Sequence, residues 1–261
     1  MKKTSLSIVG LSLAVVAALG GCGDDAAKDS TSTGTTETGT SAAAPTDAAP
    51  VPAGALGELV AAAEKTTSTS AKVAMKSGSV TIDGAFDAPG ELVEMDSDFG
   101  DAGTIKILRV GNDLYLKAGG SIAASYSGNG KKWLHVDASK QTGTLSVEQN
   151  DPSSTAKLLS TAASDVTGSG GSYQGTLDMS KSPTVSSAVG SAGDKFKAIP
   201  FTAEVKDGYL TKVTTDMSKV AQGAGKSVTA YSGFGAPVDV KAPAAAQTME
   251  MSAADIKKMG G

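Results

Sequence analysis

The stretch IKILRVGNDLYLK, which spans residues 105–117, decides the fold class of this chain. Ile105 and Ile107 alternate with polar neighbours, and a second apolar run, Leu114–Leu116, follows after a short gap. Alternation with a period of two is typical of a β-strand with one buried face. The gap is the tripeptide Gly111–Asp113, whose residue types favour tight turns. The stretch therefore predicts a hairpin of two antiparallel strands.

The same alternation extends in both directions and predicts a meander of antiparallel strands. Upstream it covers residues 71–99, and downstream the run Trp133–Asp137 closes this half of the chain. The segment 119–132 is small and polar, and we interpret it as a loop or a wide hairpin end. Further strands are predicted over 173–179, 199–205, 209–213 and 228–234, with a turn at Asp207-Gly208 and a candidate extension of the last strand at 238–240.

Four segments have helical patterns instead. In Gly54–Thr67 the apolar residues fall at the i, i+3, i+4 and i+7 positions of one helix face. Asp151-Pro152 predicts a helix start, because an acid caps free N–H groups and proline suits the first turn. Shorter helices are predicted over 182–192 and 252–259. This order of elements predicts an α+β fold, with an antiparallel sheet and the helices gathered on one face.

The N-terminal segment has the features of a secretory signal. Lys2 and Lys3 precede an apolar run over 6–19, and Gly20-Gly21 lies directly before Cys22, the only cysteine. The alternative is a membrane-spanning helix, which needs about 20 apolar residues, whereas this run is shorter and is interrupted by glycine and serine. The segment resembles the lipobox of bacterial lipoproteins. That resemblance implies cleavage before Cys22 and acylation of its sulfur, with palmitate among the expected acyl groups.

Composition divides the chain into a signal peptide at 1–21, a tether at 22–53, a single domain at 54–250, and a C-terminal tail or short helix at 251–261. The tether begins at the lipidated cysteine and consists almost wholly of small and polar residues. Such a segment cannot bury enough apolar surface to fold, so we interpret it as disordered. A flexible coil of about 30 residues has a mean reach of roughly 30 Å, enough to lift the domain clear of the lipid headgroups.

The charge pattern argues against nucleic acid as a partner. The net charge is −4, and it becomes −6 when residues 1–21 are removed with their two lysines. Arg109 is the only arginine, although arginine is the residue best suited to phosphates and base edges. The lysines are scattered along the chain, so membrane attachment would depend on the lipid. One acyl chain holds a protein marginally, whereas two or more hold it stably.

An ordered set of motifs resembles the LppX/LprG-type actinobacterial lipoproteins. The motifs are the strands in Lys72–Phe86, the turn and strand Gly111–Lys117, the strand Lys132–Asp137, Asp151-Pro152 before a leucine-rich helix, the hairpin Val205–Leu210 and the segment Tyr231–Val238. No single motif is diagnostic, and the resemblance covers residues 54–243.

The resemblance implies a LolA/LolB-like fold for the domain: a curved antiparallel half-barrel that covers a few helices, with an apolar cavity between them. Family members carry acyl lipids or lipid-linked glycans outside the cell membrane. The expected ligand is therefore an acyl lipid or a lipoglycan, and a membrane transporter is a candidate partner. The residues expected to line the cavity are Leu59, Val73, Val80, Ile82, Val93, Ile105, Ile107, Leu114, Leu116, Leu158, Leu159, Phe201 and Val213.

A closed core is the alternative for these lining residues, since apolar side chains would also pack against one another. Each methylene group removed from water contributes about 0.8 kcal/mol, so a lipid tail needs no charged residue in order to bind. Aromatic residues make up only 4% of the chain, however. A small or closed cavity is thus an open alternative.

Three constellations resemble catalytic or binding motifs, and each has a simpler interpretation. Gly223–Ser227 resembles the end of a phosphate-binding loop, but Val220 stands where the pattern needs glycine, and a strand follows. Ser154–Lys157 matches the Ser-x-x-Lys of penicillin-binding enzymes, but the companion motifs precede it instead of following it. His135 is the only histidine, beside Trp133 on one predicted strand face, and it has no second histidine or cysteine with which to bind zinc. The sequence predicts no catalytic residue, no metal site and no cofactor.

The predicted function is that of a monomeric, non-enzymatic lipoprotein on the extracytoplasmic face of the cell membrane, which binds or transports lipids or lipid-linked glycans in an apolar cavity. The alternative is a structural or accessory envelope lipoprotein with a filled core that modulates a membrane partner. A hydrolase that uses His135 and Ser154 is a third hypothesis.

Overall fold

The structure, a computed structural model, describes residues 53–181, 194–218, 220 and 225–259, and every structural statement below concerns these residues. The predicted signal peptide, Cys22 with the tether up to residue 52, and the predicted helix over 182–192 lie outside the described residues.

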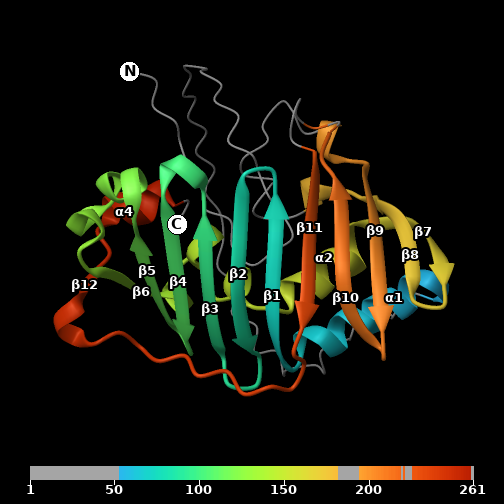
Figure 1. The fold of residues 1–261 in the computed structure, drawn as a ribbon, viewed down its shortest axis with the longest axis horizontal. Coiled ribbons are helices and arrows are strands. Elements are labelled where there is room, and N and C mark those ends of the chain that lie inside the picture. Colours follow the sequence, from blue (N-terminus) through green and yellow to red (C-terminus); the bar gives the residue numbers. More distant parts are fainter. Residues whose placement is uncertain (1–52, 182–193, 219, 221–224, 260–261) are drawn as a thin grey trace, which may run out of the picture.

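Two antiparallel meanders lie side by side in one curved sheet (Figure 1). The first consists of β1 (Ser70–Ser77), β2 (Val80–Asp87), β3 (Leu92–Asp98), β4 (Thr104–Val110), β5 (Asp113–Ala118) and β6 (Trp133–Asp137). The second consists of β7 (Ala163–Ser169), β8 (Ser172–Leu177), β9 (Ile199–Lys206), β10 (Tyr209–Asp216) and β11 (Lys226–Ser232). A short strand, β12 (Thr248–Glu250), pairs in parallel with β6.

The described strands form one twelve-stranded sheet in the order β12-β6-β5-β4-β3-β2-β1-β11-β10-β9-β8-β7. The two meanders meet at its centre, where β1 and β11 pair antiparallel. The outermost strands are therefore β12 and β7.

The helices are α1 (Gly54–Thr67), α2 (Ser154–Ala162) and α4 (Ala253–Lys258). Figure 1 places α1 and α2 behind the second meander, and α1 packs against β1, β7, β9 and β10. The face of the sheet that carries these helices is called the inner face here, and the opposite face is the outer face. The predicted α+β class, with a curved antiparallel sheet over a few helices, is confirmed.

Side-chain alternation explains why the sheet buries its inner face. In β1, Ala71, Val73 and Met75 are buried, whereas the intervening Lys72 and Lys76 are exposed. The inward apolar residues of both meanders join with those of α1 and α2 in one core cluster. Burial of this continuous apolar surface is the main favourable term in the stability of the domain.

The C-terminal part of the chain crosses the outer face. Residues 233–247, called the strap here, run from β11 to β12 along the lower margin of the sheet in Figure 1. In the strap, Val240 is buried against Leu108 and Tyr115, which point outward from β4 and β5, and Val238 packs beside them. This second, smaller apolar cluster attaches the strap to the outer face.

Several predicted elements are confirmed with their bounds. The helix Gly54–Thr67 and the strand Trp133–Asp137 appear as predicted. Asp207-Gly208 connects β9 to β10 as a hairpin turn, with Asp207 and Gly208 both at positive φ. The terminal helix is present as α4, and the hydroxyl of Ser252 accepts a hydrogen bond from the Asp255 N–H at its start.

Other local predictions are wrong. The chain enters β7 directly after α2, and the sequence pattern misses this strand because it lies at the edge of the sheet with mostly exposed side chains. The predicted extension over 238–240 is part of the strap and pairs with no strand. In β11 the buried side consists of Ser227, Thr229 and Tyr231, the alternate set to Val228 and Ala230, because pairing with β1 and β10 determines its register.

Candidate functional site

The residues predicted to line a cavity all belong to the core cluster on the inner face. They come from α1, α2, β1–β5, β9 and β10, so residues far apart in sequence meet on one surface. All of them are buried except Val80, which is partly buried at the margin of the cluster. Leu59, Ile105, Leu116 and Leu159 have no exposed surface at all. In the described residues these side chains pack against one another, and the presence of a guest stays a prediction.

The two halves of the inner face have different covers. Regular helices, α1 and α2, cover the second meander. Next to β5 and β6, the cover consists of short 3₁₀ turns, including η2 (Gly120–Ser125) and η3 (Ser127–Gly130), together with the short helix α4, whose Ile256 packs against the core cluster. Ile122, Ala123 and Tyr126 of this segment are buried in the core cluster. The sequence pattern missed them, because a segment rich in glycine and serine shows no helical or strand period.

Arg109 closes one end of the inner face. Its side chain points inward from β4 and is almost fully buried, with 1% of the residue exposed. Its Nε donates to the Gly111 carbonyl at 2.8 Å, and one terminal nitrogen donates to Asp151 Oδ2 at 3.3 Å. Burial by itself would raise the pKa of Asp151, but hydrogen bonds from Ser153 and Arg109 outweigh it and lower that pKa. The only arginine of the chain thus holds the segment before α2 against the sheet.

Two hydroxyl groups meet inside the core where α2 faces β11. Tyr231 points inward from β11, and its hydroxyl lies 3.3 Å from Thr155 Oγ1 in α2. Burial raises the pKa of Tyr231, so its phenol is neutral at physiological pH. The neighbouring Ser154 Oγ is buried and has no hydrogen-bond partner among the described residues. Lys157, the companion of Ser154 in the Ser-x-x-Lys pattern, pairs with Glu148 at 3.4 Å instead.

His135 lies on the outer face, between two carboxylates from different strands. Its Nε2 is 2.8 Å from Asp113 Oδ1 in β5, and its Nδ1 is 2.8 Å from Glu250 Oε1 in β12. Burial alone would lower the pKa of His135, but the hydrogen bonds to Asp113 and Glu250 outweigh it and raise that pKa. The ring of Tyr115 lies 5.0 Å away, centroid to centroid. The strap and β12 form the other wall of a pocket of about 390 Å³ over these two rings.

The geometry around His135 is unsuited to a metal ion. Its two ring nitrogens point in opposite directions and each already faces a carboxylate, so no nitrogen is left to join both carboxylates around one ion. Within the described ranges, no cluster of three or more histidine, cysteine, aspartate or glutamate side chains has the arrangement of a metal site. Sequence reasoning paired His135 with Trp133 and missed Asp113 and Glu250, because only strand pairing brings them together.

The glycine-rich segment that resembles a phosphate-binding loop leads into a strand. Lys226 and Ser227 are the first residues of β11, whereas a phosphate-binding loop must open a helix. Gly225 has φ +62°, a left-handed conformation that glycine adopts at no steric cost. Where the structure describes this motif, it leads from Gly225 into a strand, whereas Gly223 and Ala224 lie outside the described residues.

Comparisons with known proteins find similarity among solved structures. No family model matches the chain, and no curated protein sequence matches it. None of the helices in the described ranges has the length and apolar character needed to span a bilayer. Among solved structures, the chain is similar to the lipoprotein LppX of Mycobacterium tuberculosis, with 16% sequence identity, a TM-score of 0.47, and coverage of 72% of this chain and 98% of that chain. This neighbour is of the LppX type that the sequence motifs resemble.

Proposed function

We propose that this chain is a lipoprotein, anchored through Cys22 outside the cytoplasmic membrane, that binds the acyl part of a lipid or lipoglycan at the inner face of its sheet. The observation that carries the proposal is the apolar inner face, which continues across both meanders in one cluster. An apolar surface of this kind suits hydrocarbon, which needs no directional partner.

The segment that covers the first meander is the part of the cover that we expect to open for the acyl chain. Short 3₁₀ turns have weaker hydrogen-bond geometry than α-helices and few internal bonds, so they open at a lower free energy than α1 does. About ten methylene groups buried against β2–β6 would contribute roughly 8 kcal/mol. An acyl chain therefore has a favourable place beneath the segment that contains η2 and η3.

Lipid uptake tests the proposal directly. The full mature chain with Cys22→Ser, which lacks the anchor, would be titrated with a fluorescent fatty acid and examined by native mass spectrometry. We expect saturable uptake. Ile107→Trp, which fills space on the inner face of β4, should weaken uptake, because the added bulk competes with the guest.

Lys106→Trp is the matched control. It adds the same side chain to the outer face of the same strand, where Lys106 pairs with Glu94. Uptake should stay unchanged in this variant. Absence of uptake by the parent chain, or an equal effect of the two tryptophans, would rule out an acyl site on the inner face.

The anchor is tested in cells. The parent chain should sediment with membranes and incorporate an alkyne analogue of palmitate, whereas Cys22→Ser should do neither. If both forms sediment alike, the anchor is not Cys22.

A second function is favoured by the packing of the predicted lining residues. Nearly all of them are already buried against each other, which suits an accessory envelope lipoprotein with a filled core that modulates a membrane partner. This function predicts no lipid uptake, an unchanged fold without the tether, and a membrane protein crosslinked to the chain in intact cells.

A further inference from the structure

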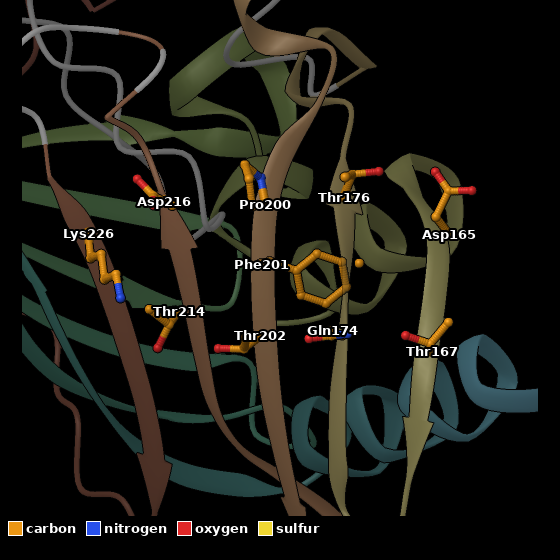
Figure 2. Close-up of a pocket in the computed structure, with 11 residues that line it drawn as sticks. Asp165, Thr167, Gln174, Thr176, Pro200, Phe201, Thr202, Thr214, Asp216 and Lys226 are labelled. Carbon is orange, nitrogen blue, oxygen red and sulfur yellow. The ribbon is translucent and has the colours of Figure 1, made fainter.

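The outer face of the second meander contains a groove of about 370 Å³, and the ring of Phe201, which belongs to the core cluster, lines part of it (Figure 2). A row of four uncharged side chains crosses it. Thr167 pairs with Gln174, Gln174 with Thr202, and Thr202 with Thr214, so the row spans β7, β8, β9 and β10. Residues paired across neighbouring strands lie on the same face about 4.8 Å apart, which makes the row roughly 14 Å long.

An uncharged row is not the rule on this outer face. The equivalent row across the first meander is Asp83, Asp96, Lys106 and Lys117, paired in the same way across β2–β5. There, Lys106 lies 3.0 Å from Asp96. Charged pairs of this kind keep a solvent-facing sheet soluble, so the neutral row of the second meander differs from its surroundings in chemistry as well as in position.

The neutral row is free to bind a ligand and is held rigidly. In the described part of the chain, none of its four side chains forms a hydrogen bond with another protein group. Three of the four are threonines, whose branched Cβ restricts the first side-chain torsion on a strand. Their hydroxyl groups are therefore oriented before a ligand arrives, which lowers the entropy cost of binding.

The rest of the groove excludes several classes of ligand. Beside the neutral row lie Thr176, Pro200, Asp216 and Lys226, and Asp165 lies in β7, the edge strand. Two carboxylates against one ammonium group make the groove a poor site for phosphate or sulfate. Apolar atoms contribute the larger share of the groove surface, but its hydroxyl, amide and charged groups would lose their water without gaining a partner if hydrocarbon covered them.

We propose that this groove binds an uncharged saccharide of one or two rings. Hydroxyl and amide groups both donate and accept hydrogen bonds, as the hydroxyl groups of a sugar do. Pro200, which pairs with Thr176 beside the neutral row, offers an apolar surface for the C–H groups of a sugar ring. The volume lies at the lower end of the range of ligand pockets, which sets the size of the ligand.

Saturation-transfer NMR tests the proposal with the full mature chain carrying Cys22→Ser. The probes are the disaccharides of glucose, mannose and N-acetylglucosamine, with glucose 6-phosphate as the anionic comparison. We expect saturation transfer to at least one disaccharide, with backbone amide shifts confined to β7–β11. The double variant Thr202→Val/Thr214→Val, which keeps the shape of both side chains, should weaken that binding at least about fivefold through the loss of two hydrogen bonds.

The matched control is Thr81→Val/Thr104→Val, which removes two hydroxyl groups from the outer face of β2 and β4. It should leave the affinity unchanged, and the thermal unfolding midpoint of both double variants shows whether the fold is intact. No transfer to any disaccharide, preferential binding of the phosphate, amide shifts outside β7–β11, or equal effects of the two double variants would each overturn the proposal. The test contains no lipid, so its outcome is separate from that of the acyl site.

Discussion

Arg109 is the residue with the most unusual environment in the described chain, because a permanent charge is buried at the end of a strand. Its hydrogen bonds to Gly111 and Asp151 and a weaker approach to Glu91 at 3.8 Å replace the water that it loses. Such an arrangement is costly to break, since removal of one partner leaves the other polar groups buried without a bond.

Arg109→Met should lower the free energy of unfolding by about 3 kcal/mol, because Asp151 Oδ2 and the Gly111 carbonyl lose the donors that Arg109 supplies. Urea denaturation measures this loss. Lys106→Met on the outer side of the same strand is the control, and loss of its exposed pairs with Glu94 and Asp96 should cost less than about 1 kcal/mol. Equal losses in the two variants would show that Arg109 contributes no more than a surface charge.

We expect His135 to make the attachment of β12 dependent on pH, because its ring bridges Asp113 of β5 and Glu250 of β12. Its raised pKa means that the folded state binds the proton more tightly than the unfolded chain does. The stabilisation by Asp113 and Glu250 is therefore fully present below the ordinary histidine pKa of about 6.5, and it is lost as pH rises through the raised value. Tyr115 faces the same ring, and its own pKa is raised by burial and by the same two carboxylates, so it stays neutral over this range.

The free energy of unfolding of the parent chain should accordingly exceed that of His135→Gln at about pH 5.5, and this difference should shrink as the pH rises to about 9. Urea denaturation at each pH measures it, and amide protection factors of β12 show where the change is located. Glu250→Gln should reduce the same dependence. A difference that stays constant with pH would contradict a charged His135 in the folded protein.

At the scale of elements, the end of α1 is joined to the hairpin of β9 and β10. Thr66 Oγ1 donates to the Leu210 carbonyl at 3.3 Å and accepts from the Leu210 N–H at 2.8 Å. Leu210 lies next to the register shift between β9 and β10. One threonine hydroxyl thus satisfies both backbone groups of a residue beside an irregular part of the ladder.

Thr66→Val should lower the free energy of unfolding by about 1–3 kcal/mol, because Leu210 would be left with two buried, unpaired groups. The neighbouring Thr67→Val is the matched control. Thr67 is also buried, but its hydroxyl donates to the Ala63 carbonyl of its own helix, so its loss should be smaller. Thermal or urea unfolding distinguishes the two, and a loss of equal size would show that the link to the hairpin contributes nothing.

Elements could be predicted from the sequence where the pattern that determines them lies within their own residues. The helix Gly54–Thr67 has its own apolar stripe, and the hairpin at Asp207-Gly208 has its own turn residues. The strand β7 has no such signal, because an edge strand with exposed side chains buries little. The inward side of β11 was also beyond local reasoning, since Ser227 and Thr229 face inward only through their pairing with other strands.

At the scale of the whole molecule, the sites depend on strand register. His135 meets Asp113 because β5 pairs with β6, and it meets Glu250 because the strap returns β12 to that edge. The neutral row of Thr167, Gln174 and its neighbours exists only because four strands align. The sequence therefore predicts the apolar residues of the inner face, whose pattern is periodic, but not the polar sites of the outer face.

The central pair of strands has a consequence for how the chain reaches its folded state. Lys72 of β1 pairs with Ser232 of β11, so the middle of the sheet joins two nearly opposite ends of the domain sequence. Contacts so distant along the chain require the closure of a long loop, which makes folding slow. Under the proposed export of this chain, slow folding would keep it extended during translocation, and the sheet would be completed only after β11 has emerged on the far side.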